Sequence, residues 1–406
     1  MEKTKSNLSR RKFLSTAAAG LAATGLAGLA PQLSLAQEGK KTKTATQPEI
    51  IYRTLGKTGM NLPIVSMGVM IANNPGLLQA AYEKGIRLFD TAAAYQYGQN
   101  EQMVGRVINK LKVREKVNIG TKVYTAGQRV DDPAAAKKKL IELCEGCLKR
   151  LRTDYVDILY LHDISNSGIV NNPGLQEAFA ELKEKKKILA SGISTHANMA
   201  AVINDTVEAG FYDVILTSMN ISMANNGDLM TAVKNAAGKG IGIIAMKTQA
   251  GGARLSADQI AGFSNKTIQN ALLRWVMRMP EITASIPGLA NYDHLNDNFE
   301  IAYSLEYTPE EEKLLTDSNI QLGMGFCHQC RKCMASCPHK VDIPALMRIH
   351  MYAASYGDFI QARQVLNDIP RGKSLDACGS CEQCSIACAN SVKIGDNIDQ
   401  LKVIYG

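Results

Sequence analysis

The 406-residue sequence lacks three features that would each point to a broad class of protein. The apolar run from Ser15 to Ala30 is rich in Ala and Gly and too weakly hydrophobic for a membrane anchor, which must partition strongly into lipid. Charge is not concentrated either: the first 36 residues hold five basic and one acidic residue, so the formal +8 falls to +4 without them. That excess is too diffuse to indicate nucleic-acid binding. We also find no flavin-binding motif.

Cysteine is scarce through most of the chain and abundant near its end. Eight of the ten cysteines follow residue 326, in two clusters whose close spacing indicates metal ligation rather than a disulfide framework. Zinc is the alternative, but zinc sites favour separate Cys-x-x-Cys pairs, whereas each cluster here repeats that step across three cysteines. The clusters are Cys327, Cys330, Cys333 and Cys337, followed by Cys378, Cys381, Cys384 and Cys388.

The doubled spacing resembles that of a bacterial ferredoxin with two 4Fe–4S clusters. The resemblance implies crossed ligation, in which the first three cysteines of each run share a cluster with the last cysteine of the other run. Ala389 stands where such a second run usually has proline. We therefore expect residues 323–406 to form a small α-rich, ferredoxin-like iron–sulfur domain, with a helical insert at Ala345–Leu366 between the runs.

The first 36 residues have the features of an export signal. Ser9-Arg10-Arg11-Lys12-Phe13-Leu14 precedes the weak apolar run, and Ser34-Leu35-Ala36 supplies small residues where a signal peptidase would cut. The pattern resembles a twin-arginine signal peptide, and the alternative is a basic, disordered tail. The resemblance implies an exported, periplasmic protein with no stable membrane span after the signal is removed. Residues 37–49 are typical of a solvated linker.

From residue 50 to residue 322, apolar β-prone runs alternate with helical patterns. This rhythm predicts the α/β class, with eight βα units closing a (β/α)8 TIM barrel, and a hairpin over residues 51–64 at its bottom. The expected strands are Ile64–Met70, Ile86–Asp90, Val117–Val123, Val156–His162, Leu189–Ser194, Val214–Asn220, Ile241–Lys247 and Ile282–Pro287. The expected helices include Leu77–Lys84, Ala134–Arg152, Leu175–Lys187, Met199–Ala209, Ile260–Arg278 and Glu310–Asn319.

Polar residues end three successive expected strands. Asp90, Lys122 and His162 would lie on one rim of the barrel, where barrel active sites are built, with Tyr95 on the loop above them. A nearby lysine would lower the pKa of the tyrosine, and the aspartate would hold the lysine charged and in place. A neutral histidine would orient a substrate oxygen. Any one of these residues alone is more simply a polar group at a strand end, but together they predict a catalytic set.

Asp, Tyr, Lys and His in this order resemble the tetrad of the aldo-keto reductases, and the resemblance extends to residues 99–105 and 153–157. It implies an oxidoreductase that interconverts a carbonyl and an alcohol with NADP(H), in which Tyr95 transfers the proton. The spacing Asp-Thr-Ala-x-x-Tyr selects Tyr95, so we assign Tyr97 to the wall of the mouth. Cys144 and Cys147 lie mid-helix with no further ligand nearby, and we assign them to packing.

The same resemblance implies a set of nucleotide contacts. A strand that ends in Gly288 before a helix start offers backbone donors to an anion, and the Gly251-Gly252 loop would close over the pyrophosphate. Two pairs depart from the family pattern: Met219-Asn220 replaces Tyr-Asn under the nicotinamide, and Ser194-Thr195 replaces Ser-Asn at the carboxamide. The implied contacts are Ser194, Thr195, Met219, Asn220, Lys247, Ser285, Ile286, Pro287, Gly288, Asp297 and Asn298.

The leading hypothesis is therefore an exported oxidoreductase that acts on a small carbonyl or alcohol and carries two 4Fe–4S clusters. The clusters would serve as rigid scaffolding or as a docking port for a redox partner protein. The alternative from another class is an iron–sulfur electron-transfer or partner-docking protein whose barrel binds a ligand without turning it over. The presence of bound nucleotide discriminates between the two.

Overall fold

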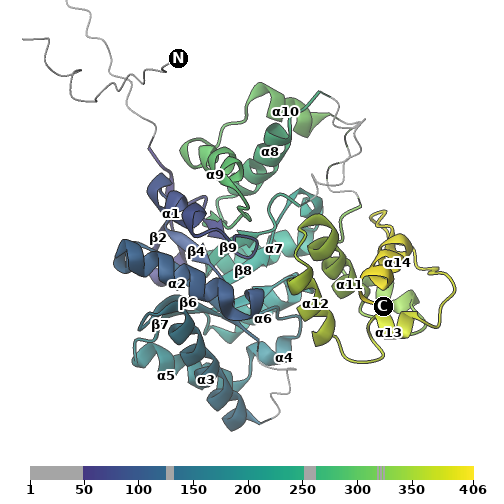
Figure 1. Cartoon of the computed structure of the whole chain (residues 1–406), viewed down its shortest axis with the longest axis horizontal. Helices are drawn as coiled ribbons and strands as arrows, with labels where there is room; N and C mark the ends of the chain where they lie inside the picture. The colour runs from purple at the N-terminus through teal and green to yellow at the C-terminus, as the bar shows by residue number, and fades with distance from the viewer. Residues whose placement is uncertain (1–48, 125–131, 251–261, 318–319, 321, 323–324) are drawn as a thin grey trace, which may run out of the picture. The chain divides into compact units, whose positions relative to one another are not determined.

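Eight apolar strands form a parallel sheet that curls into the predicted barrel (Figure 1). The computed structural model describes residues 49–124, 132–250, 262–317, 320, 322 and 325–406, so the segment predicted to be an export signal and the Gly251-Gly252 loop lie outside the described residues. The strands are β3 (Met67–Gly68), β4 (Leu88–Asp90), β5 (Asn118–Val123), β6 (Val156–Leu161), β7 (Ile188–Thr195), β8 (Val214–Ser218), β9 (Gly242–Met246) and β10 (Ala284–Ser285).

The barrel closes between its last and first strands. The sheet runs in order from β3 to β10, and single bridges join Val65 to Ser285 and Gly68 to Gly288. The predicted first and eighth strands were too long, because only two residues of each join a regular ladder and the flanking residues make isolated bridges. The predicted hairpin is confirmed as β1 (Tyr52–Thr54) paired antiparallel with β2 (Asn61–Pro63).

Helices surround the barrel, and several begin at a strong cap. Asn74, Asp132 and Asn172 each accept a backbone N–H and are followed by proline at the first helical position, where proline's missing donor costs nothing. The described helices of this part are α1 (Pro75–Lys84), α2 (Gln99–Leu111), α3 (Pro133–Leu151), α4 (Ser167–Val170), α5 (Pro173–Glu184), α6 (Met199–Ala209), α7 (Gly227–Gly238), α8 (Asn265–Met277), α9 (Tyr292–Phe299) and α10 (Pro309–Thr316).

Two predictions about helices are resolved by local detail. The expected helix at Ile260–Arg278 begins at Asn265, because the Ser264 side chain accepts the Thr267 backbone N–H and caps it there. Cys144 and Cys147 are fully buried within α3, which confirms their assignment to packing. None of the helices in the described ranges is long and apolar enough to cross a membrane.

The regular elements of the C-terminal part, over its described residues 325–406, are all helices, joined by turns and irregular segments. The predicted helical insert Ala345–Leu366 is confirmed, and it is divided in two: Gly357 adopts a left-handed φ of 65°, and Asp358 caps a new helix by accepting a hydrogen bond from the Gln361 N–H. The elements of this part are η7 (Lys332–Ser336), α11 (Ile343–His350), the π-helical turn η8 (Met351–Ser355), α12 (Phe359–Asp368), α13 (Leu375–Cys378) and α14 (Ile394–Tyr405).

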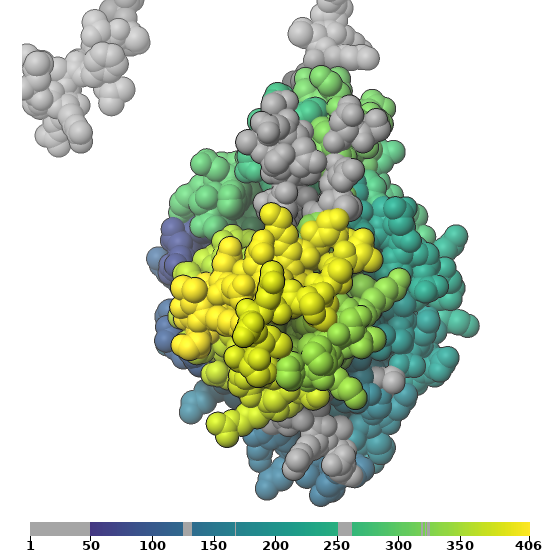
Figure 2. Space-filling view, turned by 90° about the vertical axis from the view of Figure 1, so that its right-hand side faces the viewer, coloured from purple at the N-terminus to yellow at the C-terminus, as the bar shows by residue number. Residues whose placement is uncertain are grey.

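This helical part has its own small core and also packs on the barrel. Its apolar cluster is built around α11, α12 and α14, and Met70 of the barrel packs against it. Figure 2 shows its surface, in yellow and yellow-green, lying directly over barrel elements in blue and teal. The barrel rim that carries the strand ends is therefore partly covered by the C-terminal part.

Candidate active site and cysteine clusters

The four residues of the predicted catalytic set meet at the carboxyl rim of the barrel. Asp90 is the last residue of β4, Lys122 lies in β5, and His162 directly follows β6. Tyr95 opens the 3-10 turn η2 (Tyr95–Gly98) that leads into α2. Asp90 and Lys122 are each 1% exposed, so this chemistry is removed from bulk water.

Lys122 is the centre of the set. Its Nζ forms an ion pair with the Asp90 carboxylate, donates to the Thr91 carbonyl at 2.7 Å, and lies 3.4 Å from the Tyr95 hydroxyl. The ammonium is thus held by two oxygens and directed at the phenol. This is the arrangement that the order of residues in the sequence predicts.

Burial dominates the proton affinities of this group. It raises the pKa of Asp90 and lowers that of Lys122, while the contact between the two opposes both shifts. Burial, reinforced by the Asp90 charge, raises the pKa of Tyr95 well above its ordinary value. The prediction that Lys122 would lower the pKa of the phenol is therefore wrong in its net direction. The phenol stays protonated at neutral pH, which is the form that can donate a proton.

His162 is held as a neutral imidazole. Burial, followed by the Lys122 charge, lowers its pKa well below the ordinary value. The ring stacks on Tyr124 with 4.3 Å between centroids and meets the Tyr95 ring edge-on at 6.0 Å. Its Nδ1 has no hydrogen-bond partner among the described residues. A neutral ring of this kind can hydrogen-bond a substrate oxygen without adding charge.

The segment after Tyr95 fixes the rim of the barrel through hydrogen bonds. Asn100 donates to the Val69 carbonyl at 2.7 Å and accepts from the Thr91 hydroxyl at 2.7 Å. Gln96 and Tyr97 both take left-handed φ values, and Tyr97 is 65% exposed. Its assignment to the wall of the mouth was wrong, because Tyr97 is not among the residues that line the cavity below.

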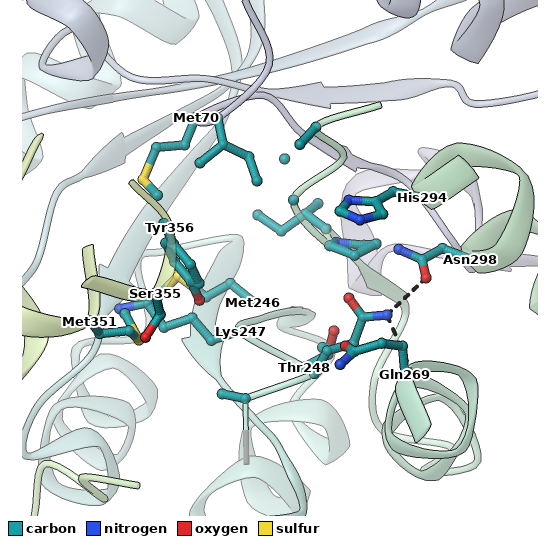
Figure 3. Close-up of a pocket in the computed structure, with 18 of the residues that line it drawn as sticks. Met70, Met246, Lys247, Thr248, Gln269, His294, Asn298, Met351, Ser355 and Tyr356 are labelled. Atoms are coloured by element: carbon teal, nitrogen blue, oxygen red, sulfur yellow. Dashed lines mark hydrogen bonds between the residues drawn. The ribbon is translucent and has the colours of Figure 1, made fainter. Parts of the chain in front are cut away.

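A cavity of about 450 Å³ opens from this rim and has two chemically different ends (Figure 3). At one end lie thioethers and a phenol ring from Met70, Met351 and Tyr356, and at the other lie the polar side chains of His294 and Asn298. Tyr95 and Asp90 are part of its lining. So are six predicted nucleotide contacts, namely Lys247, Ile286, Pro287, Gly288, Asp297 and Asn298.

The remaining predicted nucleotide contacts do not line the cavity. They are fully buried, and Thr195 already donates to the Ala197 carbonyl at 3.1 Å. Two buried hydroxyls, of Ser194 and of the lining residue Thr248, have no partner among the described residues. Such orphaned donors fit a polar ligand, because a buried hydroxyl left unpaired is unfavourable. The buried set is Ser194, Thr195, Met219, Asn220 and Ser285.

The eight C-terminal cysteines gather into the two sets that crossed ligation requires. A cavity of about 140 Å³ is lined by the first three cysteines of one run and by Cys388 of the other. Burial raises the pKa of Cys378 to about 11, and Cys337, Cys381 and Cys384 add to that rise. No three His, Cys, Asp or Glu side chains in the described ranges converge tightly enough for a single metal ion. Four thiols around one cavity supply the kind of ligand set that holds an iron–sulfur cluster.

Comparison with known families agrees with both halves of this description. Residues 72–260 match the model of the Aldo/keto reductase family, and residues 326–393 match that of the 4Fe-4S dicluster domain. The chain contains an aldo/keto reductase domain followed by a 4Fe-4S dicluster domain. A curated Oryza sativa subsp. japonica protein named as a probable voltage-gated potassium channel subunit beta is 32% identical over 120 residues. That match covers 27% of this chain and 37% of the relative, so the chain spans little more than a third of the length of the relatives it matches.

Solved structures resemble the barrel. A Pseudomonas aeruginosa protein assigned to the aldo-keto reductases is 27% identical, with a TM-score of 0.50 over 63% of this chain and 95% of the other. The holo form of an aldo-keto reductase from Bacillus halodurans is 20% identical, with a TM-score of 0.54 over 69% and 100%. An aldo-keto reductase from Klebsiella pneumoniae, solved in complex with NADPH, is 23% identical, with a TM-score of 0.52 over 65% and 94%. The latter two show likeness of fold alone.

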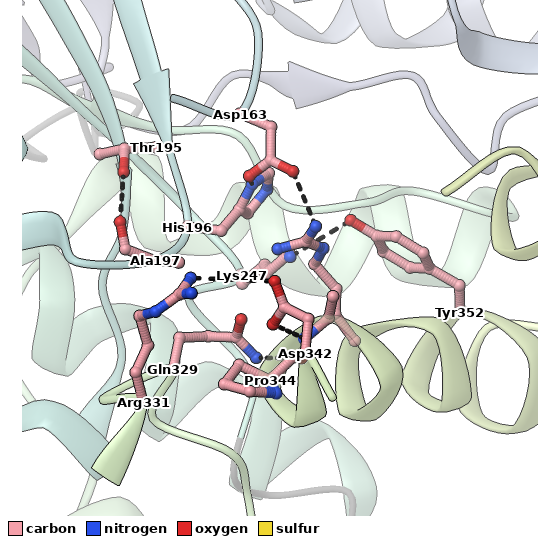
Figure 4. A network of polar contacts seen from close by, with 12 residues as sticks. Asp163, Thr195, His196, Ala197, Lys247, Gln329, Arg331, Asp342, Pro344 and Tyr352 are labelled. Carbon is pink, nitrogen blue, oxygen red and sulfur yellow. Dashed lines mark hydrogen bonds and ion pairs between the residues drawn. The ribbon is translucent and has the colours of Figure 1, made fainter. Parts of the chain in front are cut away.

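A network that sequence reasoning missed joins the two domains (Figure 4). Asp163 accepts from Arg348 of the dicluster domain at 2.7 Å and contacts His196 Nδ1 at 2.9 Å. Burial alone would raise the pKa of Asp163, but Arg348 and His196 outweigh it and hold the pKa well below its ordinary value. A second contact joins Lys247 Nζ to the Tyr352 hydroxyl at 3.3 Å. Sequence carries no local signal for the two pairs between the domains, whose members lie 185 and 105 positions apart.

Proposed function

We propose that the aldo/keto reductase domain interconverts a small carbonyl compound and an alcohol with a nicotinamide nucleotide. The observation that supports this most directly is the Lys122 ammonium, held by Asp90 and 3.4 Å from the Tyr95 hydroxyl at the edge of the cavity. A bound nicotinamide nucleotide would supply or accept the hydride. The chain's own residues would bind the substrate and move the proton.

In the direction of reduction, Tyr95 would donate its phenolic proton to the carbonyl oxygen. Its raised pKa keeps that proton in place at neutral pH. Lys122 would stabilise the phenolate left behind, since an ammonium close by favours the charged form. The neutral His162 would hydrogen-bond the same oxygen and orient it. In the reverse direction the phenolate would take the proton from an alcohol.

The proposed nucleotide is NADP(H), which would lie along the cavity with its phosphates near Ile286–Gly288. The orphaned Ser194 and Thr248 hydroxyls fit a polar ligand there, and the Klebsiella pneumoniae structure of the same fold was solved with NADPH. Mass spectrometry of nucleotide released from the purified protein tests this choice. Recovery of NAD(H) alone would contradict it.

Replacement of Tyr95 by phenylalanine tests the reaction. The change removes only the oxygen, so nucleotide binding should survive while turnover falls at least about 10²-fold, the usual scale of lost acid–base catalysis. Tyr97→Phe is a matched control, since Tyr97 is 65% exposed two positions away. Wild-type turnover in Tyr95→Phe on an accepted carbonyl would end the proposal.

We further propose that each of the two cysteine sets holds one 4Fe–4S cluster. The hydrogen bonds from Gln329 to Cys327 Sγ at 3.3 Å and from Asn390 N to Cys388 Sγ at 3.4 Å support thiolate ligands in the first set. Anaerobically purified protein should carry about eight irons and eight labile sulfides per chain. Cys378→Ser should halve both, Cys144→Ser should change neither, and stoichiometric zinc without sulfide would refute the clusters.

Export by the twin-arginine route remains part of the proposal, as does a redox partner protein that docks at the clusters. Both clusters and nucleotide are assembled in the cytoplasm, and this route carries folded chains. A double change, Arg10→Lys with Arg11→Lys, should leave the protein in the cytoplasm with its iron intact. Arrival of that variant in the periplasm would contradict this mode of export.

The second candidate is an iron–sulfur electron-transfer or docking protein whose barrel binds a ligand without turnover. It is favoured by Met219 and Thr195, which depart from the family pattern, are fully buried and do not line the cavity. Nucleotide content discriminates between the candidates. Protein that contains no nucleotide and binds none would favour this second function over the first.

A further inference from the structure

The π-helical turn η8 of the dicluster domain lies on the active-site cavity. Met351, Tyr352, Ser355 and Tyr356 all belong to the cavity lining, and Figure 3 shows three of them along its apolar end. A π-helical turn is rare and is found frequently at functional sites. Here the turn and the residue after it, Tyr356, present side chains from four closely spaced positions to one space.

Two contacts across the domain boundary fix this turn in place. One turn before it, Arg348 is buried and pairs with Asp163, the residue after His162. Within it, Tyr352 accepts from Lys247 at 3.3 Å, and the Lys247 Nζ lies 5.1 Å from the Tyr352 ring centroid. Asp163 and Lys247 both hold a left-handed φ of 55°, a backbone conformation that the surrounding structure must support.

The side chains at this end favour an apolar group. Met70, Met246 and Met351 surround it with thioethers, which adapt to flat rings and contact them favourably. Tyr356 adds an aromatic face from the dicluster domain. The polar side chains His294 and Asn298 line the other end, which suits the nucleotide instead.

We propose that the turn Met351–Tyr356 is the substrate-selecting wall of the cavity, and that the preferred substrate is a carbonyl compound with an aromatic or similarly flat apolar substituent. This inference rests on the proposed function for the position of the carbonyl, next to Tyr95. It assigns to the dicluster domain a role in choosing the substrate that does not depend on electron transfer. Tyr352 and Arg348 are positioning residues, whereas Met351 and Tyr356 contact the substituent.

Tyr356→Ala in the full chain tests the wall, with iron content checked to equal that of the wild type. Benzaldehyde and propanal are the probes. We expect kcat/KM for benzaldehyde to fall at least about 10-fold through a higher KM, and kcat/KM for propanal to change less than about 2-fold. Tyr356→Phe keeps the ring and should retain the preference. Phe359→Ala is the matched control, because Phe359 is 53% exposed on the same domain.

Calorimetric titration of both aldehydes into the same variants separates this inference from the proposed function. If the wild type turns over neither aldehyde, the proposed function fails, while a loss of benzaldehyde affinity confined to Tyr356→Ala still supports the wall. If the wild type is active and Tyr356→Ala keeps the benzaldehyde-to-propanal ratio, the wall is refuted. An equal loss in Phe359→Ala would refute it too.

Discussion

Two buried ion pairs stand on the same rim of the barrel and differ in where their partners come from. Asp90 and Lys122 lie on neighbouring, hydrogen-bonded strands, and both are 1% exposed. Asp163 also follows a strand, but its partner Arg348 comes from the dicluster domain, 185 positions away. The first pair is formed by barrel residues alone. The second pair forms only when the dicluster domain supplies Arg348 to the rim.

A third buried pair provides a reference away from the cavity. Arg274 of α8 pairs with Glu311 of α10, and both side chains are at most 7% exposed. Neither residue lines the cavity. Substitutions in the three pairs can therefore distinguish the folding free energy lost when a buried charge has no partner from a direct effect on the reaction.

Lys122→Met is expected to have the largest effect. It leaves the Asp90 carboxylate buried without a partner, which costs about 3–5 kcal/mol of folding free energy, and it removes the cation beside Tyr95. Turnover should fall at least about 10²-fold. Urea unfolding and steady-state rates measure the two effects, with the exposed Lys116→Met as control. Turnover within 10-fold of the wild type would show that Lys122 is only structural.

The success of the sequence prediction follows the same division between local and distant partners. The strand ends at Asp90, Lys122 and His162 were predictable, because a buried parallel strand is a local apolar run that ends at a polar residue. The Arg348–Asp163 pair was not, since nothing in either segment indicates the other. Tyr97 was misassigned because two left-handed residues turn its side chain outward, and residue type alone does not reveal such a turn.

Burial accounts for the wrong direction of one pKa. The pKa of Tyr95 was expected to fall because a lysine lies nearby, but the desolvation of the phenol and the Asp90 charge raise it, and depth of burial is a property of the folded chain. The predicted helical insert is present, but its division into two helices depends on Gly357 in a left-handed conformation, next to the capping residue Asp358. Both residues were visible in the sequence, but helix-forming residues on either side concealed their effect.

Arg274→Met should have the next largest effect on stability and should not affect the reaction. Glu311 would remain buried with its backbone capping contact to Thr308 but without its cation, so we expect a loss of about 3–5 kcal/mol. The rate constant kcat should stay within about 2-fold of the wild type, measured at a temperature where both are folded. A fall in kcat comparable to that of Lys122→Met would mean that the rim is sensitive to any buried charge.

Arg348→Met should lower the free energy of unfolding by a smaller amount, about 1–3 kcal/mol. Asp163 keeps its contact with His196 Nδ1, and its side chain is 16% exposed, so water and the imidazole offset part of the loss. The substitution should also raise the pKa of His196, because Arg348 is one of the charges that lower it. Urea midpoints test the cost, and Arg348→Lys should recover part of it. A loss as large as that for Lys122→Met would show that His196 does not compensate.

His196→Asn should have the smallest effect and is best seen as a change in pH dependence. Burial, followed by the Lys247 charge, lowers the pKa of His196 to about 3, so the folded protein holds this ring neutral while the unfolded chain protonates it near pH 6.5. Because the folded-state pKa is depressed, the contribution of His196 to stability is present above pH 6.5 and is lost as the pH falls toward 3.

Between pH 7.5 and 5.5 this loss amounts to about 1.4 kcal/mol. Asparagine cannot titrate, so the variant should lose that much less stability than the wild type over the same interval, measured by urea unfolding at both pH values. Equal losses in wild type and His196→Asn would show that Asp163 already holds a protonated imidazole, and that the pair across the domains is an Arg–Asp–His⁺ triad instead.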